Sequence, residues 1–186
     1  MKNYYTKMKL PEPLVPALQA LSLLKGQTAL VTGANSGIGR AIAVSLGRAG
    51  ANVVVNYVVK PEEAEAVVGE IQGGGGHATA IRADVGDEAQ VVAMFAEAVD
   101  ILVSNAGMER RAPFHAMTTA QWDAVMNVNL RGAFLCAREA VREFLRRGVR
   151  PEVSVAAGKI IFISSVHELI PWAGHVNYAA SKGGLM

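Results

Sequence analysis

The chain has 186 residues, of which 51% are hydrophobic and 18% charged, and its formal net charge is +2. This length and composition fit one folded domain with a sizeable core and exclude a disordered protein. The chain lacks the concentrated basic face of a nucleic-acid-binding protein and any apolar run of membrane-spanning length, so we expect neither nucleic acid nor a membrane as a partner.

Residues 1–24 are predicted to form a leader or strap before the folded domain of residues 25–186. Early lysines and an apolar stretch give this segment the look of a secretory signal, but Pro11, Pro13 and Pro16 interrupt the apolar stretch. Because no small-residue cleavage site follows before the first predicted strand, we do not interpret the segment as a signal peptide.

From residue 27 the chain alternates short β-branched runs with longer amphipathic stretches, the pattern of βαβ units in a parallel sheet. The predicted strands are nearly continuous apolar runs, as expected where helices cover both faces of a sheet. In chain order these strands are residues 28–33, 52–58, 77–85, 100–107 and 158–165. The predicted helices between them are residues 36–50, 60–76, 87–99 and 118–148.

The longest predicted helix, residues 118–148, begins at a threonine cap and carries two features that bear on location and partners. Cys136 is the only cysteine, so no disulfide forms within the chain, which fits the reducing cytoplasm. A cluster of arginines near the helix end lacks interleaved aromatic residues. We interpret it as a solvated helix face, formed by Arg142, Arg146, Arg147 and Arg150.

The segment VTGANSGIGRAIA follows the first predicted strand and opens the first predicted helix. Glycines in such a turn let the backbone approach a ligand and leave amide groups and the helix N-terminus free to bind the pyrophosphate of a dinucleotide. Alone, Gly33, Gly37 and Gly39 could equally serve only the dihedral angles of a tight turn. Their position between a strand and a helix favours cofactor binding.

Several motifs occur in the order and strand context of one known family. The turn has the spacing T-G-x-x-x-G-x-G, Asp84 ends the third strand, and the fourth strand ends in SNAG, residues 104–107. Asn129 lies in the long helix, and Ser165 ends the fifth strand. Tyr178 and Lys182, four residues apart, share a helix face, although such a pair alone would more often be structural. Together these motifs resemble the short-chain dehydrogenase/reductase family.

The resemblance implies a three-layer, doubly wound α/β Rossmann fold and a nicotinamide cofactor. It implies that Tyr178 is the acid/base and that Lys182 supplies a cation, which a phenol needs because it ordinarily ionises only near about pH 10. Ser165 would hydrogen-bond the substrate oxygen, and Asn129, rather than Asn127, would support a water-linked proton relay. The residues implied to bind the cofactor are Thr32, Gly33, Asn35, Ser36, Gly37, Ile38, Gly39, Tyr57, Asp84, Val85, Asn105, Ala106, Gly107, Tyr178 and Lys182.

The choice between NAD and NADP depends on the end of the second predicted strand. An acidic residue there would bind the ribose 2′-hydroxyl and repel a 2′-phosphate. The sequence instead has Asn56, Tyr57 and Val58 at this place, and the nearest acids follow Lys60. Since no arginine is present to bind a phosphate either, we expect NADP or the use of both cofactors.

The segment between Ser165 and Tyr178 resembles the glucose 1-dehydrogenase branch of the family through SSVHE and IPW, as does Glu109 after NAGM. The resemblance implies that a sugar or another secondary alcohol is bound by four residues: Glu109, Ser165, His167 and Tyr178. His167 and Glu168 could equally form only a loop contact. HELIPWAGH lacks the H-E-x-x-H spacing, so no metal site is expected. The alternative functions are a carbonyl or acyl-chain reductase and a catalytically silent dinucleotide-binding protein.

Three departures from the family pattern are present. Val99 meets Asp100 directly, which is expected to strain the connection from helix to strand or to mark a missing stretch. The loop of residues 148–158 is longer than its counterpart, an insertion that a surface position tolerates. The chain also stops at Met186, within the helix of Lys182, without the family's C-terminal strands. We therefore expect a piece of a longer protein that assembles as a homotetramer.

Overall fold

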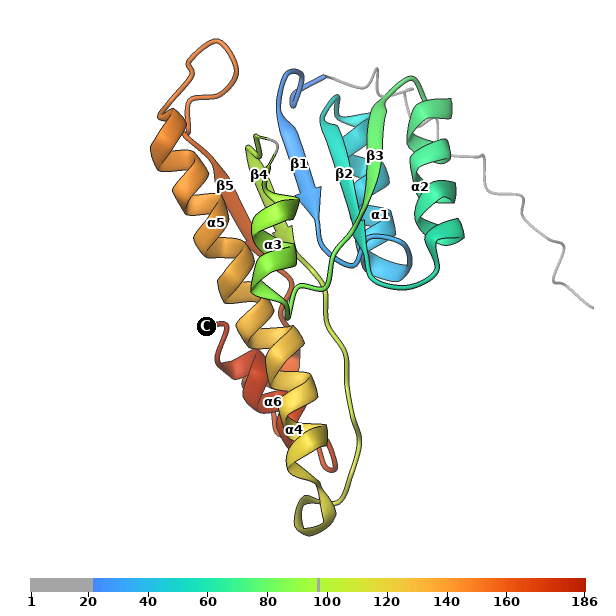
Figure 1. The fold of residues 1–186 in the computed structure, drawn as a ribbon, viewed down its shortest axis with the longest axis vertical. Helices are drawn as coiled ribbons and strands as arrows, with labels where there is room; N and C mark the ends of the chain where they lie inside the picture. The colour runs from blue at the N-terminus through green and yellow to red at the C-terminus, as the bar shows by residue number, and fades with distance from the viewer. Residues whose placement is uncertain (1–21, 97) are drawn as a thin grey trace, which may run out of the picture.

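The computed structural model describes residues 22–96 and 98–186, so residues 1–21 of the predicted leader and Glu97 lie outside the described part. Five parallel strands form one sheet in the order β3-β2-β1-β4-β5 (Figure 1). The strands are β1 (Thr28–Val31), β2 (Asn52–Tyr57), β3 (His77–Arg82), β4 (Ile101–Ser104) and β5 (Lys159–Phe162). The strand order reverses between β1 and β4, and doubly wound folds bind ligands at the carboxyl ends of the strands at such a point.

Helices cover both faces of this sheet (Figure 1). Alternate strand residues point to opposite faces, so Val31 and Val53 pack into a core with α1 and α2, whereas Leu30 and Val54 pack with α3 and α5. The helices are α1 (Gly37–Arg48), α2 (Pro61–Gly73), α3 (Glu88–Met94), α4 (Thr119–Met126), α5 (Gly132–Arg147) and α6 (Val176–Gly183). The three layers confirm the doubly wound α/β fold class expected from the sequence.

Helix α3 is shorter than predicted. It ends at Met94 instead of Val99, and Phe95 and Ala96 continue in turns, with Ala96 N donating to Ala93 O at 3.2 Å. Residues 95–100 therefore belong to the connection between α3 and β4, in which Val99 directly precedes Asp100.

The segment predicted as one helix over residues 118–148 is helical for most of its length but is not one regular α-helix. It opens with a capping box in which Thr118 Oγ1 accepts from Gln121 N at 3.2 Å, and Gln121 Oε1 accepts from Thr118 N at 3.0 Å. Helix α4 then continues through a π-helical segment, η2 (Asn127–Arg131), into α5. The sequence did not predict this segment. Such turns are frequent at functional sites, and this one contains Asn129.

Arg147 does not lie on a solvated helix face, contrary to the prediction. Its side chain is 9% exposed, and Nη1 donates to Asp100 Oδ1 at 2.8 Å. Arg150 Nη2 donates to the same oxygen at 2.6 Å, and Thr28 N donates to Asp100 Oδ2 at 2.8 Å. The prediction failed because the buried carboxylate lies 47 residues away in sequence. Arg150, which shares Asp100, is likewise only partly exposed, so only Arg142 and Arg146 lie on a solvated face as predicted.

The neighbouring strands β4 and β5 differ in burial. Every residue of β4 is buried, whereas β5, which lies at an edge, exposes Ile161 and Phe162.

On the α5 side of the core, Cys136 is fully buried, and burial raises the pKa of its thiol to about 12.

Candidate active site

The three glycines of the glycine-rich turn are needed for two different reasons. Gly33 and Gly37 have φ values of +61° and +56°, a region that residues with a Cβ rarely adopt. At Gly39 the obstacle is space, because a Cβ there would lie 2.4 Å from Gly33 O and 2.5 Å from Asn105 Nδ2. The glycines are therefore required by both backbone conformation and close approach.

Short polar side chains tie this turn to the end of β4. Thr32 Oγ1 accepts hydrogen bonds from Asn105 N and Ala106 N, each at 2.9 Å. In return Asn105 Nδ2 donates to Thr32 O at 2.9 Å and to Gly33 O at 3.2 Å. These bonds fix the turn at the point where the strand order reverses, so Thr32 and Asn105 act on the turn rather than pointing freely at a ligand.

The N-terminus of α1 fits an anion such as a dinucleotide phosphate. Its cap residue, Ser36, makes no side-chain hydrogen bond to the helix within the described part of the chain, and the first turn contains no acidic residue. The first amide groups of this helix of 12 residues therefore meet no local negative charge. Beside them, the exposed Ile38 lines a cavity that also reaches the predicted catalytic residues.

Three more of the residues predicted to bind the cofactor lie at or after the carboxyl ends of β2 and β3. Tyr57 ends β2, and Asp84 follows β3, where its Oδ1 accepts from Gly86 N at 2.8 Å. Both side chains are half-buried. Val85 instead belongs to the core, and a Cβ at Gly132 would come within 2.7 Å of its side chain. Val85 can therefore meet a ligand only through its backbone.

Tyr178 and Lys182 lie on one wall of the cavity, which has a volume of about 240 Å³. Lys182 Nζ lies 5.7 Å from the centroid of the Tyr178 ring and donates to Ile163 O at 2.7 Å. Burial lowers the pKa of Lys182 from its ordinary value. The cavity is lined by Ile38, Asn105, Gly107, Met108, Glu109, Ile163, Ser164, Tyr178 and Lys182, so it joins the glycine-rich turn to the tyrosine and lysine.

Asn129 lies next to this cavity and is buried. Its Oδ1 accepts from Met108 N at 2.8 Å, and its Nδ2 donates to Met108 O at 2.9 Å and to Ser181 Oγ at 3.1 Å. A Cβ on Gly107 would lie 3.6 Å from Asn129 Oδ1 and 3.8 Å from Lys182 Nζ. The structure thus brings Asn129 close to Lys182, with its amide group engaged by the backbone after β4.

Of the two serines after β5, Ser164 lines the cavity, whereas the predicted Ser165 is not among the lining residues. Ser165 Oγ accepts from His167 N at 3.2 Å and caps the short helix η3 (Val166–Glu168). Ser164 Oγ hydrogen-bonds Glu168, as a loop contact would require. The assignment of Ser165 therefore stays a prediction, and Ser164 becomes its rival.

Of the predicted substrate residues, Glu109 lines the cavity and His167 stacks on Trp172 with ring centroids 4.5 Å apart. Trp172 stacks in turn on the buried His175, whose Nε2 lies 3.8 Å from Glu109 Oε2. Trp172 also meets Tyr178 edge-on, with centroids 6.1 Å apart. These rings form a wall beside the tyrosine.

Comparison with known proteins agrees with this geometry. Residues 27–186 match the family model described as short chain dehydrogenase. This chain belongs to the short-chain dehydrogenase family. The 3beta-hydroxysteroid dehydrogenase 1 of Eggerthella lenta is 42% identical to it over 168 residues, which cover 87% of this chain and 62% of that protein.

Solved structures resemble this short-chain dehydrogenase family member over a similar extent. A gluconate 5-dehydrogenase from Burkholderia cenocepacia in complex with NADP and tartrate is 36% identical, with a TM-score of 0.77 over 89% of this chain and 64% of that chain. A dehydrogenase/reductase from Sinorhizobium meliloti 1021 is 40% identical, with a TM-score of 0.78 over 90% of this chain and 65% of that chain. The chain thus spans less than two thirds of the length of these relatives.

Sequence reasoning missed two polar residues that support the site in this short-chain dehydrogenase family member. Asn177 is fully buried, and its Nδ2 donates to Arg110 O at 3.0 Å and to Gln121 O at 3.3 Å. Ser181 is also fully buried and bonds Asn129. The available signal was their spacing, since Asn177, Ser181 and the adjacent Tyr178 and Lys182 repeat every four residues, as one side of a helix does.

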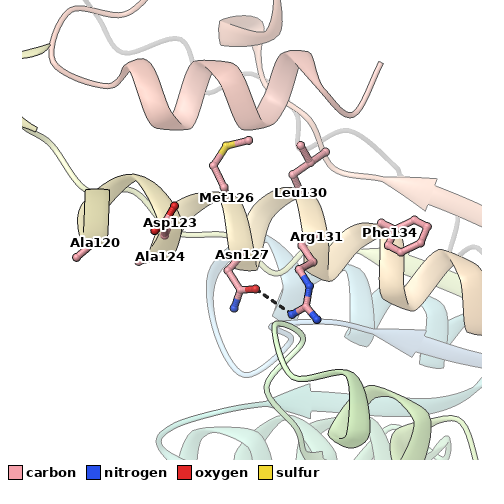
Figure 2. A pocket seen from close by; sticks show the side chains of 8 residues that line it. All are labelled: Ala120, Asp123, Ala124, Met126, Asn127, Leu130, Arg131 and Phe134. Carbon is pink, nitrogen blue, oxygen red and sulfur yellow. Dashed lines mark hydrogen bonds between the residues drawn. The ribbon is translucent and has the colours of Figure 1, made fainter. Parts of the chain in front are cut away.

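A larger cavity, of about 830 Å³, lies along α4, η2 and α5 (Figure 2), and Tyr178 is not among its lining residues. Apolar side chains of Met126, Leu130 and Phe134 lie along this stretch, and Arg131 Nη1 donates to Asn127 Oδ1 at 3.1 Å. It lacks a residue of the predicted catalytic set, so we do not assign it to the reaction.

No helix within residues 22–96 and 98–186 is both long and apolar enough to span a membrane. In the same part of the chain, no group of three or more His, Cys, Asp or Glu side chains is arranged to hold a metal ion.

Proposed function

We propose that residues 25–186 form the dinucleotide-binding and proton-transferring domain of an NAD(P)-dependent oxidoreductase that acts on a secondary alcohol. The observation that carries this proposal is the shared cavity, in which Ile38 and Asn105 of the cofactor side meet Tyr178 and Lys182. A substrate in this cavity would lie within reach of both a bound nicotinamide and the phenol. The likeness to a gluconate 5-dehydrogenase solved with NADP supports both the reaction class and the cofactor.

In this proposal Tyr178 takes the hydroxyl proton of the alcohol, or returns it to a carbonyl. The bound nicotinamide supplies the hydride chemistry. Lys182 places a cation 5.7 Å from the ring centroid of Tyr178, where it can stabilise negative charge that develops during proton transfer. Its bond to Ile163 O uses one of the three ammonium donors and leaves two for a ribose or a water molecule.

We assign supporting roles to Asn129 and to one serine. Asn129 holds Met108 and Ser181, so we propose that it supports a water-linked relay to Lys182 by fixing the π-helical turn. Ser165 is proposed to hydrogen-bond the substrate oxygen, and the position of Ser164 on the cavity wall makes it the alternative. Parallel Ser164→Ala and Ser165→Ala variants decide between them, because only replacement of the serine that binds the substrate should lower kcat/KM strongly.

We propose a sugar or a sugar acid as the substrate. The support comes from the carboxylate of Glu109, which lines the cavity and can accept hydrogen bonds from hydroxyl groups. Glucose is the substrate implied by the sequence motifs, and gluconate is implied by the similar structure. A 3β-hydroxysteroid is the competing class, because of the Eggerthella lenta relative.

The test measures the absorbance of the reduced nicotinamide while the protein is incubated with NAD or NADP and with glucose, gluconate or a 3β-hydroxysteroid. Tyr178→Phe and Lys182→Met should each lower turnover by about 100-fold or more. Lys25→Met, which changes an exposed lysine, is the matched control. Reduction only of small ketones would favour a carbonyl reductase. Cofactor binding without turnover on any substrate would contradict the proposal and favour the silent dinucleotide-binding protein.

We also propose assembly as a homotetramer in the cytoplasm. Phe134, on the face of α4 and α5, is 57% exposed beside other apolar side chains, which supports a protein contact there. Light scattering measures the assembly directly. The Phe134→Arg variant should dissociate the tetramer. If the molar mass of this variant equals that of the native protein, the contact between subunits lies elsewhere.

A further inference from the structure

Asn56, near the end of β2, has no free side-chain group with which to bind the cofactor ribose. This side chain is buried, its Oδ1 accepts from Gly33 N at 3.1 Å, and its Nδ2 donates to Ala83 O at 2.9 Å. Asn56 therefore fixes the glycine-rich turn against the neighbouring strand. Asn56 is therefore not the group that distinguishes a 2′-hydroxyl from a 2′-phosphate.

Glu63, in the first turn of α2, brings a carboxylate to this place. Its Oε2 accepts from Asn35 Nδ2 at 3.3 Å, and Asn35 lies within the glycine-rich turn. Its Oε1 accepts from Lys60 Nζ at 2.5 Å. A carboxylate and an ammonium thus stand together beside the turn, where the acid of a dinucleotide-binding fold ordinarily ends the second strand.

The backbone around Lys60 is unusual. Among the residues that the structure describes, Lys60 is the only non-glycine with a positive φ, at φ 60° and ψ 67°. The following Pro61 disfavours the right-handed helical region for Lys60, and Glu63 N donates to Lys60 O at 3.1 Å. The hydrogen bond that Lys60 Nζ donates to the Glu63 carboxylate raises the pKa of Lys60. Lys60 is therefore a cation whose position depends on Glu63.

We propose that Lys60 and Glu63 together set the choice between NAD and NADP, which rests on the proposed function. Lys60 binds a 2′-phosphate by a charge-assisted hydrogen bond. Glu63 accepts from a 2′-hydroxyl and opposes the phosphate, both by repulsion and by holding Lys60. Because Lys60 favours one cofactor and Glu63 the other, the native chain accepts both.

The experiment measures dissociation constants of NADH and NADPH by calorimetry, without any turnover. Glu63→Gln should tighten NADPH and weaken NADH, so that the ratio of the two constants changes about tenfold. Lys60→Met should weaken NADPH about tenfold and leave NADH nearly unchanged. Binding of NADPH should also lose salt dependence in Lys60→Met, since an ionic contact is removed.

Two matched controls change a charge of the same kind elsewhere. Glu65→Gln alters an exposed acid on the same helix, and Lys25→Met alters an exposed lysine. Neither should change the ratio. An equal effect of Lys60→Met on both cofactors, or an unchanged ratio in Glu63→Gln, would overturn this inference while the proposed function stands. Failure of the native protein to bind either cofactor would overturn both.

Discussion

The two ends of the parallel sheet are built from different kinds of residue. At the carboxyl ends of β1 and β4, the contacts are made by glycines, by Thr32 and by Asn105, so backbone atoms stay close to the surface. At the amino ends, long charged side chains meet a buried carboxylate. The first arrangement leaves room for a ligand, and the second fills the space with the protein's own groups.

The amino end joins three segments that are distant in sequence. Asp100, just before β4, binds Thr28 at the start of β1 and Arg147 at the end of α5. Lys159 of β5 donates to Gln27 at 2.8 Å. Although burial would raise the pKa of Asp100, hydrogen bonds from Thr28 and the two arginines hold that pKa below its usual value. We infer that this end contributes to stability and the other to binding.

The largest effect is expected at the amino end. Asp100→Ala removes the buried carboxylate that accepts from Arg147, Arg150 and Thr28, and should lower the free energy of unfolding by about 4 kcal/mol, although Arg147 keeps its ion pair with Glu143. Urea denaturation measures this loss. Under conditions where the variant is folded, its affinity for NADPH should stay within about twofold of the native value. A parallel loss of affinity would show that the two ends are not separate.

The Asp100 carboxylate makes the free energy of unfolding depend on pH. A folded pKa below the unfolded one gives a contribution that is present above the unfolded pKa, about 4, and is lost as the pH falls through the folded pKa. Between these two values the native protein should therefore lose stability more steeply than Asp100→Asn. Identical slopes of unfolding free energy against pH in the two proteins would argue against this account.

At the carboxyl end, Gly39→Ala forces a methyl group toward Gly33 O and Asn105 Nδ2. Because the nearer contact is backbone, the turn must move, at a cost of about 3 kcal/mol. A displaced turn should weaken NADPH binding by about 100-fold. Calorimetry and urea denaturation together measure the two losses. Normal affinity in the folded variant would mean that the turn does not hold the cofactor.

A smaller effect is expected from Thr32→Val, which keeps the shape of the side chain. It removes the acceptor for Asn105 N and Ala106 N, and leaving these partly buried donors unpaired should cost about 2 kcal/mol. The midpoint of urea denaturation reports the change. Thr28→Val, at the opposite end of β1, serves as the matched substitution and should cost less.

The smallest effect has the opposite sign. A Cβ at Gly69, within α2, would meet no atom within 4 Å, and its φ is not positive. Gly69→Ala should therefore raise the free energy of unfolding by roughly 0.5 to 1 kcal/mol, without a change in cofactor affinity. Thermal unfolding measures the gain. It also shows that the losses at Gly39 come from the turn and not from glycine replacement in general.

The sequence predicted the carboxyl end better than the amino end, for a physical reason. The glycine-rich turn is a local pattern, and Tyr178 and Lys182 are four residues apart on one helix, so both could be found without knowing the fold. The burial of Arg147 at the amino end depends on Asp100. At the carboxyl end, the role of Asn56 was not predicted, because it depends on Gly33 and on the strand beside it. Such contacts arise only when distant segments pack together.

Two further differences concern local geometry that hydrophobic periodicity does not record. The π-helical segment at Asn129 keeps the apolar pattern of a continuous helix, and α3 ends at Met94 rather than at Val99. The position of Ser164 rather than Ser165 on the cavity wall depends on one bond, from His167 N to Ser165 Oγ. Neighbouring residues of the same type cannot be ranked by sequence pattern alone.

The burial of Cys136 has a practical consequence for spectroscopy. With a pKa of about 12 and no exposed surface, this thiol stays protonated at neutral pH and is shielded from maleimide or nitroxide reagents. A cysteine introduced on an exposed helix position would then be the preferred target for a fluorescent or spin label. Distances between the two ends of the sheet could be followed in solution without first removing the native cysteine.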